Sequence, residues 1–96
     1  MNCKTVQAFL KKNANWSLSR NGKVICRKYR FKDFAEALTF IQLVGDSAQK
    51  VGHHPDITLK KYRFITLHLT THACHGLSRL DLRLAGTIEK IYCGLI

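Results

Sequence analysis

The chain has 96 residues, of which 46% are hydrophobic and 23% charged, and its formal net charge is +10. This length supports one hydrophobic core, so we expect a single domain over residues 1–96. No run approaches the roughly 20 apolar residues that a membrane span needs, and residues 1–12 lack the apolar stretch of a secretory signal. We therefore expect no membrane partner and a cytoplasmic protein, with the nucleus as the alternative. The charge leaves nucleic acid, an anionic ligand or an acidic protein as partner classes.

The first third of the chain predicts a short helix followed by a hairpin. Val6, Phe9 and Leu10 recur at helical spacing. Extended runs then flank Asn21 and Gly22. Because both of these residues tolerate a positive φ, the pair predicts a hairpin with a two-residue turn.

The next segment carries the clearest helical pattern. Asp33 and Glu36 have the spacing of a capping box, and Gly52 is placed to end the helix. The apolar stripe expected on its buried side consists of Phe34, Ala37, Leu38, Ile41, Val44, Ala48 and Val51.

Alternating β-branched residues over 57–72 predict either one long strand or two strands with a tight turn near Lys60 and Lys61. A last helix is expected to begin at Ser78. Its expected buried stripe is Leu80, Leu84, Ile88 and Ile91. The fold class that follows is α+β, an antiparallel β-sheet with helices packed on one face in α-β-β-α-β-β-α order.

All five histidines lie between residues 53 and 75. Imidazole titrates near neutral pH, so clustered histidines indicate acid–base chemistry or metal binding. His53 and His54 stand between Gly52 and Pro55, and a residue before proline is held extended. Such a stiff corner suits a positioned catalytic group. The alternative is an exposed loop that only ends the helix.

A second cluster, "TTHACHG" (70–76), places His72, Cys74 and His75 close together. With one histidine of the 53–54 pair these residues could bind zinc. The spacing matches no ordinary CxxC or HxxxH arrangement, so we expect no metal. The four cysteines of the chain have no CxxC spacing either, and we expect free thiols.

Asp81 has two interpretations. It follows Ser78 by three residues, which is the spacing of a capping box at the start of the last helix. Its carboxylate could equally accept a proton from an imidazole nitrogen and so fix the tautomer. Both roles are compatible with each other.

Together these residues resemble the pterin-4a-carbinolamine dehydratase family. The motifs that carry the resemblance are "GHHPDI" (52–57), Tyr62 and "TTHACHGLSRLDLRLAGTIE" (70–89). The segment "YRFKDFAEALTFI" (29–41) also looks like the family's hairpin exit and first long helix. The resemblance extends from about Trp16 to Ile91.

The resemblance implies dehydration of 4a-hydroxytetrahydrobiopterin to quinonoid dihydrobiopterin during pterin cofactor recycling, with no bound cofactor. On the family's pattern His53 and His72 would be the acid–base groups. His54 would mainly hold the pterin, and Asp81 would support the imidazoles. The substrate-binding residues implied by the pattern are His54, Pro55, Tyr62, Thr71 and Cys74.

The sequence departs from the family at two positions. Gln49 stands where the family usually has an ionisable residue, and His75 stands where a small residue is preferred. The resemblance also implies a homodimer or homotetramer. Two alternatives stay open: a dimerisation partner of a transcription factor, and a basic nucleic-acid module that uses "RKYRFK" (27–32) and "KKYRF" (60–64).

Overall fold

The computed structural model describes residues 3–71 and 76–96. Its elements in chain order are α1 (Cys3–Lys12), β1 (Ser17–Leu18), β2 (Ile25–Arg30), α2 (Phe34–Val51), β3 (Asp56–Lys60), β4 (Phe64–Leu69) and α3 (Arg79–Leu95). This order confirms the predicted α+β class and settles the open choice over residues 57–72 in favour of two strands. In these two described stretches no helix is both long and apolar enough to cross a lipid bilayer.

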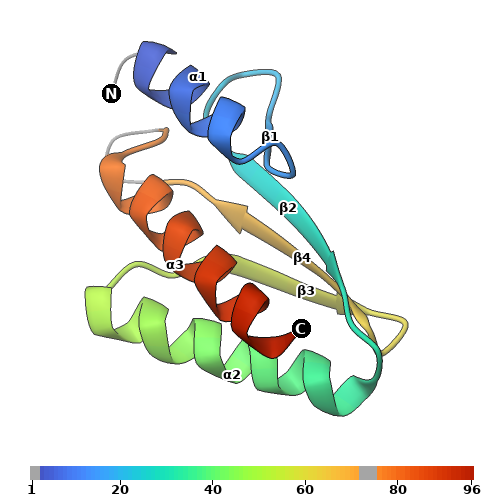
Figure 1. Ribbon diagram of the computed structural model, residues 1–96. Coiled ribbons are helices and arrows are strands. Elements are labelled where there is room, and N and C mark those ends of the chain that lie inside the picture. The colour runs from blue at the N-terminus through green and yellow to red at the C-terminus, as the bar shows by residue number, and fades with distance from the viewer. Residues whose placement is uncertain (1–2, 72–75) are drawn as a thin grey trace.

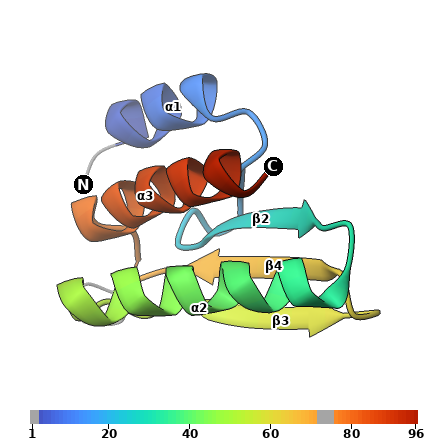
Figure 2. The same ribbon diagram turned by 60° about the horizontal axis from the view of Figure 1, so that its bottom comes forward.

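The strands form one antiparallel sheet in the order β1-β2-β4-β3. Helices α2 and α3 run in opposite directions along one side of this sheet, and α1 lies beside α3 (Figures 1 and 2). As a result, the C-terminal end of α2 and the N-terminal end of α3 lie together, far from the β3–β4 turn (Figure 1).

The core lies between the sheet and the two long helices. On β4, Ile65, Leu67 and Leu69 are fully buried, as their alternation predicts. The helical residues that bury against the sheet are Ala37, Phe40, Val44 and Ala48 of α2 and Leu84, Ala85 and Ile88 of α3.

The buried stripes of both helices are narrower than predicted. Phe34, Leu38 and Val51 are about half exposed, at 49%, 45% and 56%, and Leu80 is exposed by 44%. Phe40, which the prediction left out, is fully buried. The sheet covers only one side of each helix, so apolar residues on the flank and at the helix ends stay in solvent.

The turn between β1 and β2 differs from the predicted two-residue turn. Gly22 has a positive φ of 72°, but Asn21 does not. The Asn21 side chain instead accepts a hydrogen bond from the backbone N–H of Lys23, at 3.0 Å, as in an Asx turn. Asn21 therefore shapes the turn through its side chain, without the positive φ that a two-residue turn would require of it.

The left-handed pair occurs at the β3–β4 turn instead. Lys61 and Tyr62 have φ values of 50° and 58°, and the Arg63 N–H donates to the Lys60 carbonyl at 3.3 Å. Two central residues with positive φ match the twist of a tight hairpin. The tight turn expected near Lys60 and Lys61 is confirmed, although neither central residue is a glycine.

A polar cluster inside the fold joins α3 to the sheet. Glu89 Oε1 accepts hydrogen bonds from Trp16 Nε1 at 2.9 Å, from the Tyr29 hydroxyl at 2.6 Å, and from Arg27 Nη1. The Arg27 guanidinium also lies 4.1 Å from the centre of the Tyr29 ring. Sequence patterns did not predict this cluster, because Glu89 looks like an ordinary helical surface residue.

The cluster changes the proton affinity of its members. Burial alone would raise the pKa of Glu89, but hydrogen bonds from Arg27, Tyr29 and Trp16 outweigh burial and lower this pKa. Burial, together with the hydrogen bond to Glu89, raises the pKa of the Tyr29 phenol, so the phenol stays protonated and donates. Because the Glu89 pKa is lowered on folding, its stabilising contribution is present above the ordinary value of 4.5 and is lost as the pH falls through the folded-state pKa.

We expect Glu89→Gln to lower the free energy of unfolding at pH 7 by about 2–4 kcal/mol, because Arg27 loses its anionic partner in a mostly buried position. The difference from the unaltered protein should shrink as the pH falls below the ordinary carboxyl value of 4.5 and through the lowered pKa of Glu89, because Glu89 itself then becomes protonated. Urea denaturation across this pH range measures both effects. The exposed Asp46→Asn is the control, with a change of less than about 0.5 kcal/mol. A loss for Glu89→Gln as small as that of the control would contradict the assignment.

Candidate active site

The HHP corner begins where α2 ends. Gly52 adopts a left-handed conformation with φ 65°, and its N–H donates to the Gln49 carbonyl. The His53 N–H donates to the Ala48 carbonyl at 3.1 Å. This pair of bonds is the Schellman arrangement, which reverses the chain after a helix. The predicted C-cap is confirmed, and it turns His53 back toward the start of α3.

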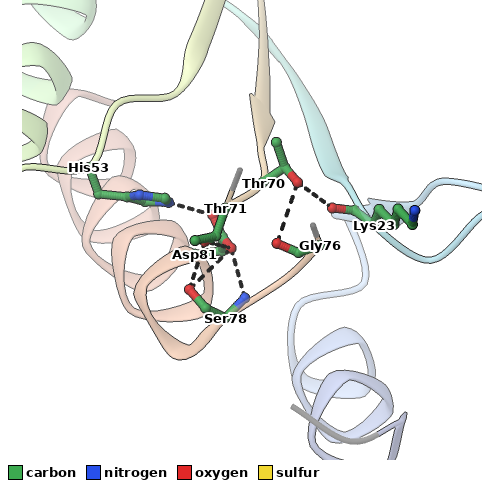
Figure 3. Close-up of polar contacts among 7 residues, drawn as sticks. All are labelled: Lys23, His53, Thr70, Thr71, Gly76, Ser78 and Asp81. Atoms are coloured by element: carbon green, nitrogen blue, oxygen red, sulfur yellow. Dashed lines mark hydrogen bonds and ion pairs between the residues drawn. The ribbon is translucent and has the colours of Figure 1, made fainter. Parts of the chain in front are cut away.

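The His53 imidazole contacts the carboxylate of Asp81. This carboxylate is fully buried in the first turn of α3, and Oδ1 lies 2.5 Å from His53 Nε2 (Figure 3). The other oxygen, Oδ2, accepts from the Thr71 hydroxyl at 2.7 Å and from the Ser78 N–H at 2.9 Å. Asp81 thus closes the helix start and contacts an imidazole at the same time, as its two interpretations require. That it fixes the tautomer stays a prediction.

The Asp81 carboxylate selects the His53 tautomer that can form this hydrogen bond. A carboxylate only accepts hydrogen bonds, so a bond to Asp81 requires the hydrogen of His53 on Nε2 and leaves Nδ1 without one. The His53 side chain keeps 11% of its surface exposed, whereas Asp81 keeps none. The N-terminal end of α3 adds positive potential, which favours the buried negative charge.

The end of β4 is held at the same place. Thr71 and Gly76 exchange two backbone hydrogen bonds, of 2.7 and 3.2 Å. The Thr70 hydroxyl donates to the Lys23 carbonyl at 2.6 Å, which links this region to the start of β2 (Figure 3). The Thr71 and Ser78 hydroxyls lie 2.7 Å apart. The network therefore fixes both residues that border 72–75.

His54 contacts Gln49 and not Asp81. Its Nε2 lies 3.0 Å from the side-chain oxygen of Gln49, and both residues are exposed. Gln49 therefore contacts His54, while the charge beside His53 comes from Asp81. Sequence analysis predicted the turn at Gly52 but not this pairing, because the direction in which each imidazole points after the turn depends on the packing of α2 against α3.

The structure does not bring every predicted site residue to this place. Pro55 is half-buried at the corner, but Tyr62 is 56% exposed in the β3–β4 turn. Strand β3 separates the two by about 16 Å of extended chain. A substrate contact from Tyr62 in the same chain is therefore not supported by its position.

Three residues of the second cluster, His72, Cys74 and His75, lie outside the described residues. Within 3–71 and 76–96 no group of three or more His, Cys, Asp or Glu side chains is arranged to hold a metal ion. Cys26 and Cys93, whose side chains are described, are free thiols.

A hollow of about 270 Å³ lies between α2 and α3 near this end of the fold. None of the predicted site residues lines it. Its walls are Ser47, Lys50, Val51, Leu80, Arg83, Leu84 and Thr87. The candidate site is therefore defined by the hydrogen-bonded network around Asp81, which includes residues that sequence analysis assigned only to helix capping or to substrate contact.

The model of the family described as pterin 4 alpha carbinolamine dehydratase matches residues 1–91. The chain belongs to this family. A relative from Koribacter versatilis, named "Putative pterin-4-alpha-carbinolamine dehydratase", is 45% identical over 77% of this chain and 78% of its own length. A relative of the same name from Picosynechococcus sp. is 38% identical over 90% of each chain.

Two solved structures share the fold of this pterin-4a-carbinolamine dehydratase family member. The crystal structure of a transcriptional coactivator/pterin dehydratase from Brucella melitensis superposes with a TM-score of 0.87 at 26% identity, covering 95% of this chain and 96% of the other. A pterin dehydratase-like protein described as a RuBisCO assembly factor of the α-carboxysome gives a TM-score of 0.69 at 13% identity, covering 80% and 88%. The second likeness concerns the fold alone.

We expect Asp81→Asn to destabilise the fold by about 2–4 kcal/mol, because the new amide cannot accept from His53, Thr71 and Ser78 together. Asp33→Asn at the exposed cap of α2 is the matched control, since asparagine caps a helix about as well as aspartate. Urea unfolding measures both variants. Equal and small losses would show that the Asp81 carboxylate is no more than a helix cap.

Proposed function

We propose that the protein is a metal-free hydro-lyase that dehydrates 4a-hydroxytetrahydrobiopterin to quinonoid dihydrobiopterin. Family membership supports the pterin dehydratase class, and the His53–Asp81 contact is the observation that carries the catalytic assignment. A positioned imidazole is suited to both proton transfers of such a reaction, because histidine is the side chain that most often serves as general acid or base.

The reaction requires one proton to be added and one to be removed. The C4a–O bond breaks as an acid protonates the hydroxyl, which leaves as water, and a base takes the proton from the adjacent ring nitrogen as the C=N bond forms. In each cycle the protein gives one proton to the hydroxyl and takes one from the ring nitrogen, so its own number of protons is unchanged. Two histidines of opposite protonation state can therefore complete the cycle without a metal or a covalent intermediate.

We assign the two proton transfers to His53 and His72. The support for His53 is its buried anchor to Asp81, which leaves Nδ1 for the substrate. The support for His72 is its covalent bond to Thr71, whose hydroxyl donates to the same carboxylate. His54, exposed at the corner and paired with Gln49, is proposed to hold the pterin ring. Thr71 then supports the site through Asp81, while Pro55 and Cys74 remain proposed substrate contacts.

Dehydration of 4a-hydroxytetrahydrobiopterin, followed by stopped-flow absorbance, tests this proposal. His53→Ala and His72→Ala should each lower kcat by about 10²–10⁴-fold, the usual contribution of a general acid or base. His68→Ala is the matched control, because His68 is exposed in the middle of β4 and outside the network. A catalysed rate in His53→Ala and His72→Ala equal to that of His68→Ala would end the catalytic assignment.

We also propose that the protein forms a homodimer or homotetramer. Strand β3 is at an edge of the sheet and pairs on one side only with β4. Helix α2 carries exposed apolar side chains at Phe34, Leu38 and Leu43. An open strand edge and an exposed apolar helix flank are surfaces through which identical chains associate.

A second candidate function is that of a partner for a transcription factor. The observation that favours it is the description of the Brucella melitensis structure as a transcriptional coactivator/pterin dehydratase. The site network around Asp81 gives no support to this role, because a binding surface does not need a buried carboxylate that fixes an imidazole. The enzyme remains the better-supported function.

A further inference from the structure

The face of the sheet opposite the helices carries basic side chains and one aromatic ring. Alternate residues of each strand point away from the core, and those with described side chains are half-buried or exposed. The outward positions are Cys26, Lys28 and Arg30 on β2, Phe64, Thr66 and His68 on β4, and Asp56, Thr58 and Lys60 on β3. We call these nine residues the outer face.

Strand register gathers the cations of the outer face around one aromatic ring. Arg30 pairs with Phe64, and Phe64 pairs with Lys60, so the ring stands between two cations in a single row across three strands. Lys28 stands in the next row, opposite Thr66. Phe64 keeps 42% of its surface exposed, and the Arg63 guanidinium lies 6.0 Å from the centre of its ring, so part of the ring is available to a partner and a further cation stands beside it.

The same place is hollowed. A shallow depression of about 360 Å³ is lined by Lys28, Lys60, Lys61, Phe64 and Thr66. None of these three lysines forms a salt bridge among the residues that the structure describes. The lining contains no carboxylate, and Asp56, the acidic residue of the outer face, stands two rows away, opposite His68. The depression is therefore positively charged around an open ring.

The candidate active site does not explain this surface. The depression lies toward the β3–β4 turn, whereas the Asp81 network lies at the opposite end of the fold (Figure 1). A pterin carries no strong negative charge that would need three unpaired lysines. An independent anionic partner accounts for the charge.

We infer that the outer face binds single-stranded nucleic acid, with a base stacked on Phe64 and phosphates held by Arg30, Lys28 and Lys60. Cations beside an exposed ring are the combination that single strands require, because bases stack on aromatic side chains while the backbone follows positive charge. A duplex keeps its base faces covered, and an acidic peptide would use the lysines but not the ring. Charge complementarity and the position of Phe64 together favour the single strand.

Fluorescence anisotropy with a labelled oligouridylate of about 12 nucleotides in about 0.1 M salt tests this inference. Phe64→Ala should weaken binding by about 5- to 100-fold, the usual effect of losing one stacked base. Leu80→Ala is the matched control, because Leu80 is exposed by 44% on α3, in the helical layer. Thermal unfolding of each variant verifies that it is folded.

The lysines are tested by the salt dependence of binding. Lys28→Ala with Lys60→Ala should reduce the slope of log affinity against log salt by about 1.4, which corresponds to two lost phosphate contacts on a single strand. Lys50→Ala with Lys90→Ala removes the same charge from exposed positions on the helices and should leave the slope nearly unchanged. Equal effects of the paired variants, equal affinity for a duplex or for polyglutamate of similar length, or no binding at all would overturn the inference.

Discussion

The buried carboxylate of Asp81 is the constraint on which the candidate site depends. It has no exposed surface, and three elements meet at it: the end of α2 through His53, the end of β4 through Thr71, and the start of α3 through Ser78. A buried carboxylate without such partners would be strongly destabilising. The fold therefore keeps these segments together, and the geometry of the imidazole follows from a requirement of stability.

Local signals predicted the parts of the fold that local chemistry decides. The cap at Asp33, the helix end at Gly52 and the alternation of Ile65, Leu67 and Leu69 follow from neighbouring residues, and each is confirmed. Predictions failed where tertiary packing decides. The exposed flank of α2, with Leu38, depends on how much of the helix the sheet covers, and periodicity alone does not contain that information.

The candidate site shows the same division. The sequence predicted the HHP corner and the capping role of Asp81, but it did not predict which side chain contacts each histidine. Gln49 pairs with His54 across the left-handed turn, while helix packing brings His53 to Asp81, 28 residues further along the chain. Tyr62 was expected near the histidines, yet the tight hairpin carries it to the other end of the fold. The role of His72 stays a prediction.

The tautomer of His53 is the most direct test of this account. In protein labelled with ¹⁵N-histidine, two-bond ¹⁵N–¹H correlation spectra at about pH 8 distinguish the two neutral tautomers of each imidazole. The account predicts that His53 carries its hydrogen on Nε2, directed at Asp81. A hydrogen on Nδ1, or rapid averaging between both tautomers, would show that Asp81 does not fix this imidazole.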